Sequence, residues 1–287
     1  MAPPPLLASY YTLSGTRPFE GPMGPSPIPL RRRIEAAAKA GYKGIGVDYF
    51  DLLASIETYG HDGIRAMLDD NGLLHFEVDG MGDWYASGPA RSDSDTVRSL
   101  LLTAAEKIGF TQLRVTGNMF GRSYPVDVMR AEFARLCHQA ADAGTRLSLE
   151  ILNISDVRDV RTALAIVGDT VPGNGGVIID IWHFARDQQS CDTIGDLSGG
   201  AIAWVEIDDG AATPQGSIIS EGLDDRLLPG DGTFDIAGFL AAARAAGYAG
   251  PIGVEVISNE LRRVTVEEAA DLTFRKASLQ FSDDTWN

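Results

Sequence analysis

The chain has 287 residues, 44% of them hydrophobic, which is enough for one large domain or two small ones. Acidic residues outnumber basic ones by 16, and this argues against a nucleic-acid partner, because proteins that bind the phosphate backbone normally carry a basic patch. There is no apolar run of about eighteen residues, no signal-peptide pattern at the start, and only two distant cysteines, Cys137 and Cys191, so a cytoplasmic enzyme without membrane span or disulfide framework is expected.

Apolar runs bounded by glycine and proline alternate with helical patterns along the chain. The predicted strands cover residues 6–13, 42–49, 73–78, 111–116, 146–152, 177–181, 202–207 and 252–257. The predicted helical segments between and after them cover residues 30–40, 64–70, 95–108, 126–143, 157–167, 191–197, 235–246 and 266–279. Several of these helices end at glycine, which left-handed C-caps prefer. A Gly- and Pro-rich loop is predicted over residues 14–29, and a long loop over residues 208–232.

Strands that alternate with helices indicate a parallel sheet with crossover helices. Eight such units in 287 residues fit an α/β fold of the TIM type, a (β/α)8 barrel. No linker or composition break is visible, so a single domain over residues 1–287 is predicted. The competing fold is an open doubly wound sheet, which usually carries a Gly-rich phosphate-binding motif after its first strand. Residues 14–29 do not contain this motif, so the barrel is favoured.

Four carboxylates stand near the C-terminal ends of predicted strands, on the face that strand alternation assigns to the barrel interior: Glu150, Asp180, Glu206 and Glu255. The same alternation adds further acids to a polar lumen: Asp48, Glu77 and Asp79. Carboxylates crowded into one barrel mouth repel one another, and a divalent cation is the obvious means of neutralising them. All-oxygen ligation favours Mg²⁺ or Mn²⁺. The alternative is that some of these acids pair with lumen cations, for which Arg114 is a candidate.

Other residues near the strand ends are weaker candidates. His183 is the one histidine that lies just past the C-terminal end of a predicted strand, three residues after Asp180. Arg226 precedes a tight turn that would present its guanidinium over the barrel mouth, unless it is an ordinary surface arginine. Three aromatic residues follow strands, where they would wall a pocket or merely pack loops: Trp84, Phe120 and Trp182.

Together these residues resemble the xylose isomerase-like TIM barrels, the sugar phosphate isomerase/epimerase superfamily. The resemblance covers nearly the whole chain and is most specific in four stretches: LEILN around Glu150, IDIWHFAR around Asp180 and His183, RLLPGDGTFD from Arg226, and GVEVIS around Glu255. It implies that Glu150 and Glu255 bind a metal and also exchange the substrate proton. It further implies that Asp180 is a metal ligand and that His183 and Arg226 contact the oxygens of a sugar. Trp182, from its position after a strand, is the expected substrate-binding wall beside them.

The strand over residues 202–207 departs from the family pattern. Family members usually carry a histidine there as the fourth metal ligand, whereas this chain reads WVEIDDG and places Glu206 in that position. A glutamate still ligates but adds a negative charge, which hardens the site toward Mg²⁺ or Mn²⁺. Co²⁺ and Zn²⁺ stay open, as does a weakly held metal or a different reaction. Asp208, two residues further on the same face, is the substitute ligand.

The resemblance implies one divalent metal and a small carbohydrate or polyhydroxy keto substrate. The expected enzyme is an isomerase or epimerase that abstracts a proton next to a carbonyl and passes through an enediolate. The alternative is a dehydratase of the inosose or 3-dehydroshikimate type. Two further hypotheses are less favoured by the sequence than these enzymes. One is a non-catalytic sugar-binding barrel, and the other is a phosphodiesterase of the endonuclease IV type, which would need several histidines and a basic surface. No nucleic-acid or membrane partner is expected, and a homodimer or homotetramer stays open.

Overall fold

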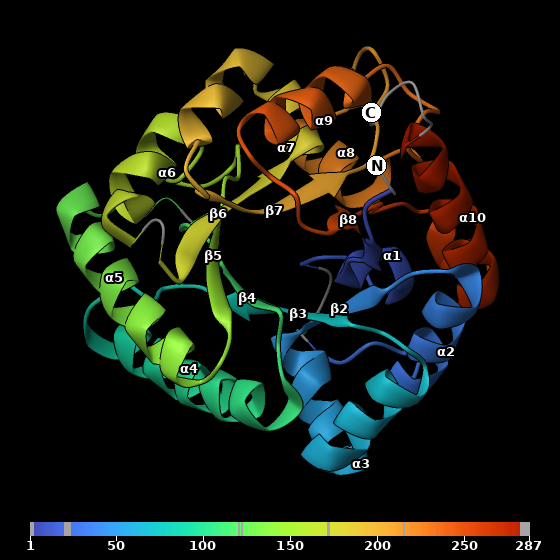
Figure 1. Cartoon of the computed structure of the whole chain (residues 1–287), viewed down its shortest axis with the longest axis horizontal. Coiled ribbons are helices and arrows are strands. Elements are labelled where there is room, and N and C mark those ends of the chain that lie inside the picture. Colours follow the sequence, from blue (N-terminus) through green and yellow to red (C-terminus); the bar gives the residue numbers. More distant parts are fainter. Residues whose placement is uncertain are drawn as a thin grey trace.

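The computed structural model describes residues 3–19, 24–119, 121, 123–170, 173–214 and 216–281. Eight parallel strands close into a barrel in chain order, and the barrel is closed where β1 pairs with β8. Figure 1 shows the larger helices as an outer ring around these strands. The predicted (β/α)8 fold is therefore confirmed.

The elements alternate along the chain. The strands are β1 Leu6–Ala8, β2 Gly44–Asp48, β3 His75–Met81, β4 Gln112–Val115, β5 Arg146–Glu150, β6 Gly175–Asp180, β7 Ile202–Ile207 and β8 Ile252–Val254. The α-helices are α1 Tyr10–Leu13, α2 Leu30–Ala40, α3 Tyr49–Asp70, α4 Gly88–Ile108, α5 Val126–Asp142, α6 Val160–Val167, α7 Ile181–Arg186, α8 Ile218–Asp224, α9 Ile236–Ala245 and α10 Val266–Ser278. Short 3₁₀ segments are η1 Gly168–Thr170, η2 Cys191–Leu197, η3 Leu261–Arg263 and η4 Leu279–Phe281. None of the helices in the described ranges combines the length and apolar character that a membrane-spanning segment needs.

The interior of the barrel is layered from apolar to charged. Its lower layer is a cluster of Leu7, Ile178 and Trp204, each at most 1% exposed. Because side chains on a strand alternate, the next lumen positions on β6 and β7 are Asp180 and Glu206, one layer closer to the mouth. The apolar lower layer therefore lies beneath the charged layer, which is nearer to the C-terminal ends of the strands.

The first strand is shorter than predicted. The chain leaves the sheet after Ala8 and makes the single helical turn α1, in which the amide of Ser14 donates to the carbonyl of Tyr10. Thr12 fixes this turn to the end of β8, because its hydroxyl donates to the carbonyl of Val254 and accepts from the amide of Val256. The apolar run over residues 6–13 therefore continues as a buried turn, which periodicity alone does not distinguish from a strand.

Three helices also differ from the sequence-based prediction. Helix α3 starts at Tyr49 rather than near residue 64, because Asp48 caps it through the amide of Asp51, and Gly60 with φ of 68° interrupts its regular pattern. The predicted loop over residues 208–232 contains helix α8, which a capping box between Ser217 and Ser220 begins. Helix α7, which starts directly after Asp180, was not predicted.

Candidate active site at the barrel mouth

The four strand-end carboxylates named above come together in the structure. One ligand oxygen from each of them lies within 4.8 Å of those of the other three: Glu150, Asp180, Glu206 and Glu255. All four side chains are buried, with exposed fractions between 0% and 5%. They reach the same point because each occupies a lumen position near the end of its strand. The sequence-based expectation that these residues share one end of the lumen agrees with this geometry.

Arg114 of β4 lies among three of these carboxylates. Its Nη1 atom is 3.1 Å from Glu150 Oε1 and 3.3 Å from Glu255 Oε1. Its Nη2 atom donates to Glu206 Oε1 and, at 2.6 Å, to Glu77 Oε1 of β3. The guanidinium is only 3% exposed, so the chain carries a cation of its own inside the acidic cluster.

Glu206 is held more firmly than a strand-end acid alone would be. Its Oε1 atom accepts from the hydroxyl of Ser9 at 2.7 Å as well as from Arg114. Gly253 on β8 makes room for it, since a Cβ atom there would lie 2.8 Å from Cγ of Glu206 and 2.8 Å from Nε1 of Trp204. The second oxygen, Oε2, is buried without a hydrogen-bond partner among the described residues.

Arg226 is a buried residue of the same site. Its Nη1 atom is 2.8 Å from Asp180 Oδ2, 3.0 Å from Asp208 Oδ2 and 3.3 Å from Glu255 Oε2. Its guanidinium carbon lies 4.9 Å from the ring centroid of Trp182, a cation–π contact. The interpretation as an ordinary surface arginine is therefore wrong: the residues on either side of Arg226 form bridges to Ser258, beyond the end of β8, and to Asp209, beyond the end of β7, and its side chain is buried.

His183 follows Asp180 on the first turn of α7. Its Nδ1 atom is 2.9 Å from Asn153 Oδ1, an oxygen that accepts, so the Nδ1 proton points at Asn153 and Nε2 keeps its lone pair. Nε2 lies 3.8 Å from Asp180 Oδ2. Burial, aided by the nearby Arg226 charge, lowers the pKa of His183 well below its usual value, so the imidazole is neutral.

The pKa values around the cluster report crowded negative charge. Burial raises the pKa of Glu150 well above its usual range, and Arg114 offsets this only in part while Glu255 adds to it. Burial likewise raises the pKa values of Glu206 and Asp208 well above their usual ranges. Two arginines therefore do not supply all the positive charge that these acids require.

A divalent cation fits this donor set. The converging carboxylates are hard oxygen ligands, and Glu206 Oε2 is a buried oxygen that lacks a partner among the described residues. A second group with metal-ligand spacing consists of Glu150, Asp180 and His183. In this group, the contact between His183 Nδ1 and Asn153 is of the kind that orients a metal-binding imidazole from the side away from the metal. Asp208, the expected substitute ligand, is in neither group with metal-ligand spacing in the described part of the chain.

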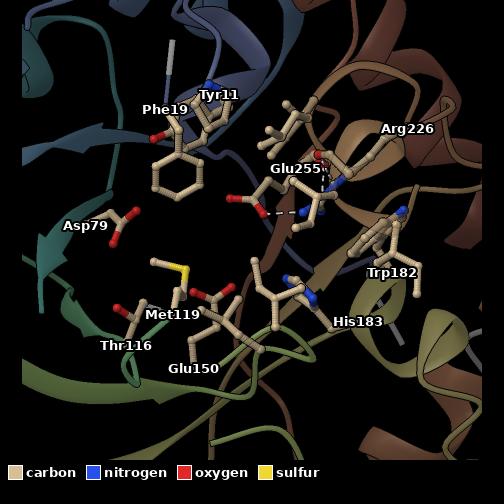
Figure 2. Close-up of a pocket in the computed structure, with 18 of the residues that line it drawn as sticks. Tyr11, Phe19, Asp79, Thr116, Met119, Glu150, Trp182, His183, Arg226 and Glu255 are labelled. Carbon is tan, nitrogen blue, oxygen red and sulfur yellow. Dashed lines mark hydrogen bonds and ion pairs between the residues drawn. The ribbon is translucent and has the colours of Figure 1, made fainter. Parts of the chain in front are cut away.

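A cavity of about 120 Å³ opens above these residues. Figure 2 shows Glu150, Glu255, His183 and Asp79 around it, with Arg226 beside Glu255. Trp182 lines it, as predicted for a wall, whereas Trp84 does not, because its indole Nε1 donates to the carbonyl of Thr116 within loop packing. Phe120, the third aromatic candidate, lies outside the described residues.

Some residues of the site were missed from the sequence. Asn153 belongs to the LEILN stretch, directly after the strand that carries Glu150, and this position was the available signal. Ser9 had none, since it reaches Glu206 across 197 residues of sequence. Tyr11 and Phe19 line the cavity from the segment after β1, which looked like a continued strand and a loop.

A family model described as xylose isomerase-like TIM barrel matches residues 34–276. The 3-dehydroshikimate dehydratase of Pseudomonas aeruginosa is 28% identical over 242 residues, which cover 81% of this chain and 37% of that protein. The inosose isomerase of Bacillus subtilis is 28% identical over 128 residues, which cover 44% of this chain and 45% of that protein. The chain thus spans less than half the length of either curated relative. Among solved structures, the IOLI protein with a bound zinc atom matches with a TM-score of 0.82 at 19% identity over 99% of both chains, which shows the shared fold.

Proposed function

The chain belongs to the xylose isomerase-like TIM barrel family, and on that premise we propose that it is a metal-dependent isomerase or epimerase. The reaction is proton transfer next to a carbonyl in a small polyhydroxy keto substrate. One observation carries this proposal: Glu150 and Glu255 both approach Nη1 of Arg114, at 3.1 and 3.3 Å, from β5 and from the end of β8. Because β5 and β8 are not neighbours in the closed barrel, the two carboxylates reach Arg114 from different parts of the wall, and both line the cavity of about 120 Å³.

The cation of this proposal is held by Glu150, Asp180, Glu206 and Glu255, with Mn²⁺ or Mg²⁺ favoured by the oxygen donors. When bound, such an ion polarises the substrate carbonyl and stabilises the enediolate. Zn²⁺ and Co²⁺ suit the alternative group that contains His183, because imidazole is a good ligand for both.

The two glutamates divide the proton transfer between them. One carboxylate removes the proton from the carbon next to the carbonyl, and the second returns a proton. Return to the other face of the same carbon gives epimerisation, and return to the neighbouring carbon gives isomerisation. The geometry supports the shared first half of both reactions.

The neighbouring side chains orient these groups. His183, neutral and fixed by Asn153, presents Nε2 as an acceptor for a substrate hydroxyl. Arg226 holds Asp180 and Glu255 in place, so its main role here is positioning rather than direct contact with a sugar oxygen. Trp182 packs against Arg226 and provides a flat wall.

The second candidate is a dehydratase that expels a β-hydroxyl from the same enediolate. It is favoured by one observation: the match to the Pseudomonas aeruginosa dehydratase covers 81% of this chain, against 44% for the Bacillus subtilis isomerase. The residues in the described part of the site are compatible with both isomerisation or epimerisation and dehydration, because these reactions share the first proton abstraction.

The test is incorporation of solvent deuterium, followed by NMR, on ketoses, ketose phosphates, inososes and 3-dehydroshikimate. Protein stripped of metal with EDTA should not incorporate deuterium, and protein reloaded with Mn²⁺ should incorporate it. A new alkene signal in the spectrum would identify a dehydratase. Glu150→Gln and Glu255→Gln should abolish turnover, because an amide keeps the shape but does not accept the proton. Glu57→Gln, the same change on exposed α3, is the matched control.

The two variants should also differ from each other. If the glutamates serve opposite faces, Glu150→Gln retains exchange into one epimer and Glu255→Gln into the other. A panel without any metal-dependent exchange, or two glutamine variants with full activity, would end the proton-transfer proposal and leave a sugar-binding barrel in its place.

A further inference from the structure

The opening of the cavity is rimmed by exposed apolar side chains. Phe19, Ile218 and Ile219 are 50%, 40% and 58% exposed, and all three line the same cavity as the catalytic glutamates. We call these three residues the apolar rim. The cavity wall includes further apolar side chains: Met119, Leu152, Ile154, Leu223 and Ile257. Exposed apolar side chains grouped around a pocket indicate a binding surface for a ligand with apolar groups.

The apolar rim is assembled from two segments that are fastened to the protein. Arg17, two residues before Phe19, makes a two-pronged ion pair with Asp224 at the end of α8, at 2.8 and 2.7 Å. Glu221 of α8 is in turn paired with Arg186 of α7, at 2.7 Å through Nε. Figure 2 shows Phe19 leaning over the same space that Glu255 enters. These contacts hold the two segments around one opening, so the rim is a built feature of the mouth.

The charged groups of the cavity disfavour an anionic ligand. Among the described lining residues the permanent cations are Arg114 and Arg226, and each already pairs with at least three carboxylates. The imidazole of His183 is already engaged, since its Nδ1 atom is 2.9 Å from Asn153 Oδ1 and its Nε2 atom is 3.8 Å from Asp180 Oδ2. A phosphate would therefore enter a region with an excess of carboxylates and without an uncommitted side-chain cation in the described part of the wall.

We propose that the substrate of this site is an uncharged keto sugar, or a sugar-like ring, that carries an apolar substituent. The ring reaches Glu150 and Glu255 at the floor, and the substituent packs against the apolar rim. This inference rests on the proposed function for the position of the reacting ring. It adds that the substrate is not phosphorylated and that recognition extends beyond the ring.

The test is calorimetric binding of 6-O-methyl, 6-O-butyl and 6-O-phenyl fructose to the metal-loaded protein, with fructose 6-phosphate as the charged comparison at the same position. A buried methylene strengthens binding by about fourfold. The butyl and phenyl ethers should then bind at least about tenfold more tightly than the methyl ether, and fructose 6-phosphate more weakly than any of the three ethers.

Variants assign this preference to the apolar rim. Phe19→Ser and Ile219→Ser should remove most of the butyl and phenyl advantage and weaken binding of the methyl ether much less. Leu74→Ser, at a side chain that is 74% exposed before β3 and remote from the mouth, should change nothing. Equal affinity for the methyl and butyl ethers, tighter binding of the phosphate, or no binding of any ether would each overturn the inference.

The outcome is separable from the proposed function. Deuterium exchange on free ketoses without a butyl or phenyl preference would keep the function and remove this inference. A rim-dependent preference without exchange on any ketone would remove the function and keep the apolar binding site.

Discussion

Replacing Arg114 by methionine should destabilise the metal-free protein strongly. The guanidinium is 3% exposed and pairs with Glu77, Glu150, Glu206 and Glu255. Methionine fills a similar space without charge, so the change removes the cation and leaves its partners inside the barrel. Breaking a buried ion pair by removing one partner costs about 3–5 kcal/mol. That is a large share of the roughly 5–15 kcal/mol that stabilises a typical domain.

A divalent cation should restore part of that loss. Without Arg114, the ligand oxygens of Glu150, Glu206 and Glu255 no longer share their charge with a guanidinium, so the ion should bind more tightly to the variant than to the parent protein. A ligand at about 100 times its Kd stabilises the folded state by about 2.7 kcal/mol. The double variant Arg114→Met with Glu206→Gln should lose less than the sum of the two single changes, because one of the stranded charges is then absent.

Urea unfolding in EDTA and in Mn²⁺ measures both effects. Arg186→Met is the matched control, because Arg186 is also a buried arginine paired with a buried acid, Glu221, but lies outside the cluster. Mn²⁺ should stabilise the Arg114 variant more than the Arg186 variant. The reasoning is refuted if Arg114→Met is as stable as the parent in EDTA, or if Mn²⁺ stabilises both variants equally.

Three further changes probe single groups. Glu206→His should shift the metal preference toward Co²⁺ or Zn²⁺ in competition assays, since imidazole suits these ions better, and an unchanged preference would mean that Glu206 is not a ligand. His183→Ala should raise KM and leave the metal content unchanged; a fall in bound metal would make His183 a ligand instead. Burial raises the pKa of Asp48 from 3.8 to about 7, so its contribution to stability is complete below pH 3.8 and is lost as the pH rises through about 7. Asp48→Asn keeps the cap of α3 and should flatten the urea-unfolding free energy between pH 4 and about 7 by on the order of 3 kcal/mol, and an unchanged slope would contradict that pKa.

The strand framework could be predicted because it depends on local pattern. Strand β7 was predicted with the bounds that the structure has, Ile202–Ile207, since a continuous apolar run with one lumen acid leaves little choice. The segment over residues 10–13 failed because a single buried helical turn has the same composition as a strand. Helix α8 failed for a different reason: its capping box consists of two serines in a glycine-rich stretch, where the helical period is too short to detect.

The lumen acids could likewise be predicted, because alternation along each strand states which side chains point inward. What alternation does not state is how far a long side chain reaches once it is there. Arg114 starts on β4 and meets Glu206 across 92 residues of sequence and on the far side of the lumen. Its partners are set by the width of the closed barrel, which is a property of all eight strands together.

The surroundings of Glu206 likewise depend on several strands together. At that position an imidazole would add no negative charge to the cluster, whereas the carboxylate adds one and places it beside Ser9, Arg114 and the space above Gly253. The cost of that extra buried charge is offset by a guanidinium from another strand, and one oxygen, Oε2, still has no partner in the described part of the site. One oxygen of Glu206, Oε1, is thus engaged in an internal ion pair, and the other, Oε2, is available to a cation. Positions 114 and 206 are therefore coupled, because a change that removes the charge at one leaves the other unpaired in the lumen.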